Sequence, residues 1–258
     1  MPTNKQRREQ AQRRLQRQLE RREQLARKRR RNLLIGVTVV AVLAVVGAFF
    51  VITNLADDDS DTTAAAATDS SGCSYTADTS GNTALTDVGL PPGDVPTTGT
   101  AALTMTTNFG DIGLTLDQAN APCAAGSFVY LTQQGFFDGT PCHRETDSEG
   151  LKVLQCGDPS GTGTGGPSYT YPTQVTGSET YPRGTVAMAN SGSGTDGSQF
   201  FLVYGDSQLS PDYTVVGTID EAGLAVLDTI AANGNDGANG AGDGAPTQPV
   251  TITTMTVA

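Results

Sequence analysis

An uncharged run of 24 residues divides this chain into two parts of opposite character. Residues 33–56 read LLIGVTVVAVLAVVGAFFVITNLA and contain no Lys, Arg, Asp or Glu. As a helix, such a run extends about 36 Å, which exceeds the roughly 30 Å of a bilayer's hydrocarbon core. A cleaved signal peptide has a shorter apolar core and an A-x-A-like exit. We therefore predict an uncleaved transmembrane helix over 33–56.

The charges on the two sides of this run are strongly unequal. Residues 1–32 carry thirteen Lys or Arg and three Glu, whereas the remainder has only Arg144, Lys152 and Arg183 against 24 acidic residues. The positive-inside rule then puts the basic arm in the cytoplasm and everything after about residue 57 outside. The prediction is a single-pass protein of the cell membrane with an extracytoplasmic C-terminal domain.

The basic arm, residues 1–32, has two readings. Clustered Arg and Lys are typical of segments that bind nucleic acid. This arm, however, has no aromatic residues to stack on bases, and it adjoins the predicted membrane span. We favour a helix on anionic lipid that fixes the topology, and we expect no nucleic-acid partner.

The outer part changes character near residue 99. Residues 57–98 are dominated by Asp, Thr, Ala, Ser, Gly and Pro, which predicts an extended, largely disordered linker. From residue 99 apolar and polar residues alternate in short runs, and helical spacing appears over 121–135 and 220–234. The strand candidates include TAALTMTTNFGDIGLTLD, KVLQC, TVAMAN, QFFLVYG, YTVVGTI and PVTITTMTV. Many strands with two helices predict an antiparallel barrel or sandwich whose ends the helices cover.

One glycine-rich run, NGNDGANGAGDGAP at 233–246, superficially resembles a calcium loop. It lacks the ligand spacing of an EF-hand and the repeat of a β-roll. We predict a flexible surface loop there.

Four cysteines lie in the part expected outside the membrane. An even number in an oxidising compartment favours two disulfides, although four cysteines allow three pairings. Cys142 and Cys156 bracket a segment expected to fold back as a hairpin, so their pairing is plausible, and Cys73 would then pair with Cys123. A zinc site is the competing interpretation, but there is no C-x-x-C pair and only one histidine. We expect disulfides and no metal.

Three blocks of the outer part occur in order: FVYLTQQGFFDGTPCHR, LQCGDPSGTGTGGPSY and GTVAMANSGSGTDGSQFFLVYG. Together they resemble the signature blocks of the cyclophilin-type peptidyl-prolyl cis-trans isomerases, from about residue 99 to the C-terminus. The anchored, four-cysteine arrangement is similar to membrane-tethered cyclophilins of high-GC Gram-positive bacteria. The resemblance implies a mainly β fold over 99–258, a closed eight-stranded antiparallel barrel with two capping helices. It also implies no cofactor and a monomeric outer domain.

The resemblance carries site residues as well. The family's catalytic arginine follows a histidine in the first block and maps onto Arg144, whose fixed charge suits a donor for the twisted X-Pro amide. Isomerisation transfers no proton, so His143 is expected to be structural. Of the adjacent Phe200 and Phe201, one should face the core and the other the pocket. The implied substrate contacts are Gln155, Met188, Ala189, Asn190, Gln199, Phe201, Leu209, Tyr213 and Val153.

One segment departs from the family pattern. After the His-Arg pair, members usually carry an apolar run, whereas this chain has the polar and longer ETDSEGLKVLQCGD. Val153 is the best match for the family's pocket methionine, and Gln208 stands in place of the tryptophan of cyclosporin-sensitive members. These changes concern the depth of the proline pocket.

Two functions from different classes follow. The leading hypothesis is an isomerase that assists the folding of exported, proline-containing polypeptides at the outer face of the membrane. The alternative is a catalytically weak binding or chaperone module for proline-containing partners, motivated by the altered segment. A third role, scaffolding of a membrane complex through the basic arm, stays open.

Overall fold

The computed structural model describes residues 72–190, 192 and 194–258. The chain divides into units 1–66 and 67–258, and the described residues belong to the second. The basic arm, the transmembrane helix predicted over 33–56 and the first part of the predicted linker lie outside the described residues. Within the described part, no helix is long and apolar enough to cross a membrane.

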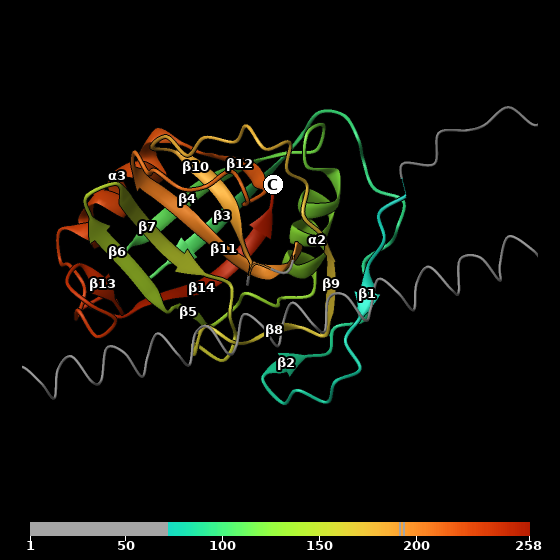
Figure 1. The fold of residues 1–258 in the computed structure, drawn as a ribbon, viewed down its shortest axis with the longest axis horizontal. Coiled ribbons are helices and arrows are strands. Elements are labelled where there is room, and N and C mark those ends of the chain that lie inside the picture. Colours follow the sequence, from blue (N-terminus) through green and yellow to red (C-terminus); the bar gives the residue numbers. More distant parts are fainter. Residues whose placement is uncertain (1–71, 191, 193) are drawn as a thin grey trace, which may run out of the picture. The chain divides into compact units, whose positions relative to one another are not determined.

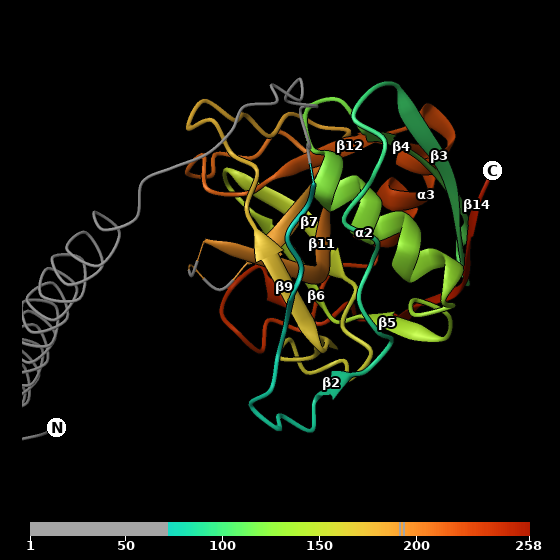
Figure 2. The ribbon, with the colours of Figure 1, turned by 90° about the vertical axis from the view of Figure 1, so that its right-hand side faces the viewer.

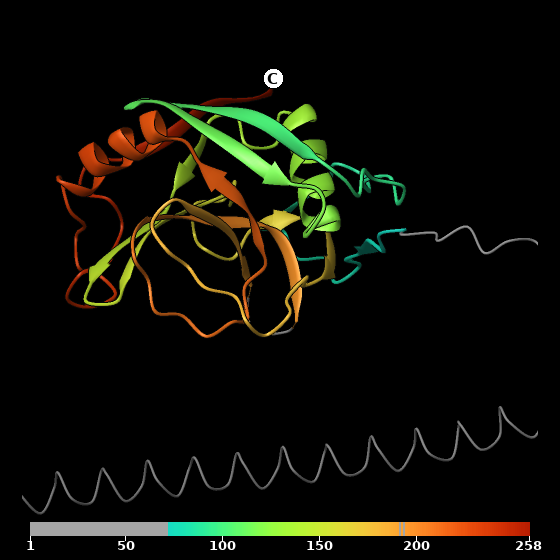
Figure 3. The ribbon, with the colours of Figure 1, turned by 90° about the horizontal axis from the view of Figure 1, so that it is seen from above.

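A curled antiparallel sheet, a separate two-stranded parallel sheet and two helices make up the described part of the chain (Figure 1 and Figure 3). Both helices form where helical spacing predicted them, and strands form over the alternating segments. The larger elements are β3 (Thr100–Thr107), β4 (Gly110–Asp117), α2 (Pro122–Gln133), β5 (Thr140–Cys142), β6 (Arg144–Ser148), β7 (Leu151–Cys156), β9 (Tyr169–Pro172), β10 (Thr185–Asn190), β11 (Thr195–Gly205), β12 (Val215–Ile219), α3 (Glu221–Ala231) and β14 (Val250–Val257). The two-residue strands are β1 (Thr76–Ala77), β2 (Leu85–Thr86), β8 (Gly166–Pro167) and β13 (Asp243–Gly244).

The expected closed, eight-stranded barrel is wrong. In the described residues the main sheet has 12 strands, and its path β13-β6-β7-β11-β10-β12-β4-β3-β14-β5 does not return to its start. The sheet is an open half-barrel. Its last strand, β5, has only three residues, and its central residue, Pro141, has no N–H to donate to a further ladder. A disulfide between Cys142 on β5 and Cys156 on β7 spans the opening instead.

The inner face of the sheet and the two helices share one apolar core. Helix α2 packs on β14 and β11, and α3 packs on β4. Phe128 of α2 stacks against Phe137 and Phe200 with ring centroids 5.1 and 4.9 Å apart. Asp220 is the N-cap of α3, since its carboxylate accepts a hydrogen bond from Gly223 N at 2.6 Å. This core fixes the curvature of the strands that carry the site.

Residues 72–98, placed in a disordered linker by composition, lie against the domain (Figure 2). β1 pairs with β9, β2 pairs with β8, and Cys73 forms a disulfide with Cys123 at the start of α2. Tyr75 packs edge-on against Tyr169 and Tyr171 with centroids 5.7 and 5.5 Å apart. A few aromatic and covalent contacts thus order a segment whose overall composition is polar. Both predicted disulfides are confirmed.

Candidate active site

A row of polar side chains crosses three neighbouring strands. The β6–β7 register sets Arg144 opposite Gln155. The Nη1 of Arg144 donates to Oε1 of Gln155 at 3.3 Å, and Nε2 of Gln155 donates to Oε1 of Gln199 on β11 at 2.9 Å. Residues brought together from positions 144, 155 and 199 therefore form one hydrogen-bonded chain.

A separate apolar cluster lies beside this row on the outer face of the sheet. Alternation along β11 sends Phe200 into the main core and Phe201 into this outer cluster, as expected for adjacent strand residues. Phe201 meets Tyr213 edge-on, with ring centroids 5.5 Å apart. The predicted members that it brings together are Val153, Ala189, Phe201, Leu209 and Tyr213.

Tyr181 is a member of the outer cluster that the sequence did not indicate. Its ring centroid is 6.1 Å from those of Phe201 and Tyr213, and its side chain is buried. Its hydroxyl donates to the carbonyl of Tyr213 at 3.0 Å and accepts from the N–H of the same residue at 3.1 Å. Tyr181 thereby holds the backbone at Tyr213. It lies outside the motif blocks, so no signal in the sequence marked it.

Met188 does not join the outer cluster. Along β10 the side chains alternate, so that Met188 enters the main core while Ala187 and Ala189 lie on the outer face. The expectation that Met188 lines the pocket is therefore wrong. Met188 and Ala189 point to opposite faces of β10, as neighbours in a regular strand do.

A cavity of about 490 Å³ adjoins the outer cluster and the polar row. Gln155, Gln199, Ala189 and Asn190 line it, together with Leu85 from β2. The side-chain amide of Asn190 donates to the carbonyl of Asp212 at 2.9 Å, which ties the strand to the segment carrying Leu209 and Tyr213. The wall at Leu85 shows that the segment before residue 99 contributes to the surface beside the site.

The glycine-rich stretch GTGTGG is held rigidly next to Gln199. Nε2 of Gln199 donates to the carbonyls of Gly163 and Gly165, both at 3.0 Å. The buried carboxylate of Asp158 accepts from the N–H of Gly163 at 2.6 Å. A Cβ at Gly165 would lie 2.1 Å from Asp158 Oδ1, so this close approach requires glycine. The loop forms one fixed wall of the cavity.

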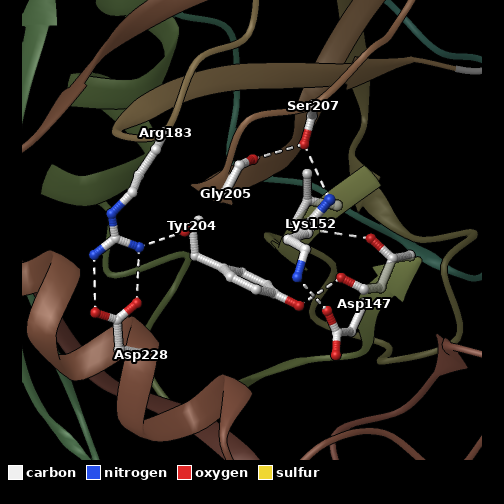
Figure 4. Close-up of polar contacts among 9 residues, drawn as sticks. Asp147, Lys152, Arg183, Tyr204, Gly205, Ser207 and Asp228 are labelled. Atoms are coloured by element: carbon white, nitrogen blue, oxygen red, sulfur yellow. Dashed lines mark hydrogen bonds and ion pairs between the residues drawn. The ribbon is translucent and has the colours of Figure 1, made fainter. Parts of the chain in front are cut away.

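The polar stretch after Arg144 forms the distal half of the β6–β7 hairpin (Figure 4). Lys152 pairs with Asp147 at 2.8 Å, and the hydroxyl of Ser207 accepts from Lys152 N at 3.0 Å. The hydroxyl of Tyr204 donates to the carbonyl of Thr146 at 2.6 Å. The longer, polar segment therefore forms a hairpin whose strands are hydrogen-bonded to Tyr204 and Ser207 near the end of β11. Leu151 of this hairpin packs against the outer cluster. In the same view Arg183 pairs with Asp228 of α3, and neither residue lines the cavity.

Asp243 is the second residue that the sequence did not indicate. It belongs to the run 233–246, which we expected to be a flexible surface loop. The run instead folds back along the hairpin and forms β13, which pairs with β6. The carboxylate of Asp243 accepts from Nε of Arg144 at 2.8 Å and from Nη2 at 2.7 Å. Hydrogen bonds from Arg144 hold the pKa of Asp243 below its ordinary value.

The single histidine is enclosed. Both ring nitrogens of His143 are buried, and burial lowers its pKa although the nearby Asp158 opposes this. A neutral ring between β5 and β6 agrees with the structural role expected for it.

The fold is cyclophilin-like: it is an open half-barrel with two helices packed on it. Its candidate site is the row of Arg144, Gln155 and Gln199 beside the outer apolar cluster. A family model described as cyclophilin type peptidyl-prolyl cis-trans isomerase/CLD matches residues 102–257. The chain belongs to this family. A cyclophilin-type isomerase from Cryptosporidium parvum superposes with a TM-score of 0.55 at 27% identity, covering 62% of this chain and 98% of that one.

Curated bacterial proteins of similar sequence are also described as peptidyl-prolyl cis-trans isomerases. A "Probable peptidyl-prolyl cis-trans isomerase B" of Mycobacterium leprae is 53% identical over 180 residues, 64% of this chain and 60% of the relative. A protein of the same description from Mycobacterium tuberculosis is 50% identical over 197 residues, 71% of this chain and 63% of the relative. A "Peptidyl-prolyl cis-trans isomerase" of Helicobacter pylori is 42% identical over 134 residues, 51% of this chain and 80% of the relative. The chain thus spans about three fifths of the two mycobacterial relatives.

Proposed function

We propose that this protein is a peptidyl-prolyl cis-trans isomerase that acts on exported polypeptides at the outer face of the cell membrane. The observation that carries the proposal is that Arg144 lies opposite Gln155 across the sheet, and Gln155 in turn lies opposite Phe201 of the outer apolar cluster. Rotation about an X-Pro bond has a barrier of about 20 kcal/mol because resonance stiffens the C–N bond. Lowering it requires a dry pocket and a fixed donor, with no nucleophile and no proton transfer.

Each group near Arg144 has a task in this proposal. Phe201, Leu209 and Tyr213, with Val153 and Ala189, form the apolar surface that receives the proline ring. In the twisted amide the nitrogen lone pair localises and accepts a hydrogen bond, which Arg144 donates without changing its charge. Gln155, Gln199 and Asn190 hold the substrate backbone. Met188 contributes only by packing behind β10.

The location is supported by covalent chemistry. Disulfides persist mainly in oxidising compartments, and the described residues contain two of them and no free cysteine. We propose an arm over 1–32, a membrane helix over 33–56, a short tether, and a monomeric isomerase domain that begins at Cys73 rather than at residue 99. Exported chains carrying X-Pro bonds are its substrates.

The test measures cis-trans exchange of a short X-Pro peptide by NMR with the full chain in detergent micelles. Arg144→Ala should lower kcat/KM by roughly 100-fold, the range for one lost transition-state donor. Arg183→Ala is the matched control, because Arg183 pairs with Asp228 away from the site. Peptide binding without exchange would support the alternative binding module. Equal rates for Arg144→Ala and the parent would remove Arg144 from the mechanism.

A further inference from the structure

The guanidinium of Arg144 forms hydrogen bonds with the carboxylate of Asp243, which is 99 residues away in the chain. Asp243 accepts from Nε at 2.8 Å and from Nη2 at 2.7 Å, so the contact is bidentate. The two side chains are 34% and 27% exposed. A pair this exposed contributes little to folding stability. The geometry of the Arg144–Asp243 pair, by contrast, fixes the orientation of the guanidinium to which the proposed function assigns the donor role.

The carboxylate is held in place by the segment that carries it. In β13, Asp243 lies opposite Thr146 of β6, and the carbonyl of Gly242 accepts from Asp147 N at 2.8 Å. The side chain of Asn239 donates to Asp243 Oδ1 at 3.1 Å. The grip on Arg144 is therefore a product of strand pairing.

The next residue shows how tightly the segment is folded. A Cβ on Gly244 would lie 2.0 Å from Oδ1 of Asp236. That oxygen accepts from the N–H groups of Ala238 and Ala245, both at 3.0 Å. Glycine at 244 thus lets the segment 236–245 close on itself and present Asp243 to β6.

The hydrogen-bond count on the guanidinium leaves room for a substrate. Of its five N–H groups, Asp243 takes one on Nε and one on Nη2, and Gln155 takes one on Nη1. Among the described residues, one N–H on each terminal nitrogen stays available. Asp243 and Gln155 together determine the plane and the direction of the fork.

We propose that Asp243 is a positioning residue for isomerisation, which fixes Arg144 so that its two remaining N–H groups meet the twisted amide. The proposal rests on the proposed function. A free arginine side chain samples many rotamers, and this conformational freedom is lost when the side chain is ordered. A donor that is fixed before the substrate arrives needs no reorganisation in the transition state. The effect belongs to kcat more than to KM.

The test compares Asp243→Asn with Asp228→Asn in the full chain. Asp228 accepts from Nη1 and Nη2 of Arg183 in another two-oxygen contact, neither residue lines the cavity, and Asp228 therefore serves as the matched control. We expect Asp243→Asn to lower kcat roughly tenfold with KM nearly unchanged, and Asp228→Asn to match the parent. In an Arg144→Ala background, Asp243→Asn should have no further effect. Asp243→Glu, which keeps the carboxylate, should restore part of the rate and also serves if the Asn variant folds poorly.

A readout independent of turnover is the Nε–H resonance of Arg144 in ¹H–¹⁵N spectra. It should be protected from solvent exchange in the parent and in Asp228→Asn, and lose that protection in Asp243→Asn. An active parent whose kcat is unchanged or raised by Asp243→Asn would overturn the inference, whatever the resonance does. An inactive parent would instead overturn the proposed function, with the Nε–H contact intact.

Discussion

Glu145 follows Arg144 directly in the chain, yet their side chains lie on opposite faces of β6. The carboxyl of Glu145 is fully buried, whereas the side chain of Arg144 is 34% exposed. Burial, followed by the charge of Asp147, raises the pKa of Glu145 to about 7. One strand therefore carries a permanent cation on its outer face and an acid that titrates near neutrality on its inner face.

This relationship predicts a pH-dependent stability. Below about pH 4.5, the ordinary pKa of a glutamate, Glu145 is protonated in both the folded and the unfolded chain and costs nothing. Between about pH 4.5 and 7 the unfolded chain ionises Glu145 while the folded chain keeps it protonated, so stability is lost, by about 3 kcal/mol once the pH exceeds 7. Glu145→Gln should therefore raise the free energy of unfolding at pH 8 more than at pH 5. Urea denaturation at pH 5 and at pH 8 measures this free energy of unfolding. Glu149→Gln, at an exposed neighbouring position, is the control and should have the same stability as the parent at both pH values.

The two disulfides should differ in their effect on activity. Replacing Cys142 and Cys156 by serine opens a 14-residue separation and should cost about 3 kcal/mol of stability. It should also lower kcat, because these cysteines adjoin Arg144 and Gln155. Replacing Cys73 and Cys123 releases a 50-residue separation and should cost about 4 kcal/mol. That second variant should retain kcat under conditions where it is folded. Thermal melts and peptide exchange assays separate the two effects, and equal kcat values would contradict the coupling to the site.

Phe200 and Phe201 offer a matched pair. Phe200→Leu changes the main core and should cost about 1 kcal/mol while leaving exchange rates intact. Phe201→Leu removes ring area from the outer cluster and should lower kcat/KM roughly tenfold. Denaturation and NMR exchange on both variants provide the comparison. A loss of activity confined to Phe200→Leu would mean that the proline site lies elsewhere.

Tyr181→Phe tests the newly found member of the outer cluster. The variant keeps the ring but loses both hydrogen bonds to the backbone of Tyr213, which should cost about 1 to 2 kcal/mol. Release of Tyr213 should raise KM for a proline peptide several-fold. Tyr130→Phe, which loses one hydrogen bond to Val88 far from the cluster, is the control and should affect stability only. An unchanged KM in Tyr181→Phe would assign Tyr181 to packing alone.

Local sequence patterns predicted most helices and strands of the fold. Alternation marked the β3–β4 hairpin, helical spacing marked α2 and α3, and the hairpin between Cys142 and Cys156 indicated the disulfide pairs. Apart from the Cys73–Cys123 pair, whose cysteines are 50 residues apart, these features depend on residues close in sequence, so short windows contain the information. The motif blocks likewise indicated Arg144, Gln155 and Phe201 as candidate site residues, and the pairing of β6, β7 and β11 places these three opposite one another across the sheet.

Contacts between distant segments decided the rest. Asp243 reaches Arg144 across 99 residues because β13 pairs with β6, and Tyr181 meets Tyr213 because a loop returns to the outer face. Neither pairing leaves a periodic trace in the chain. The sheet is open because a three-residue strand centred on Pro141 ends the ladder, a result of how the strands curl over the core. The sequence alone therefore indicated most helices and strands and the candidate site residues. Packing in three dimensions determined that the carboxylate of Asp243 binds Arg144.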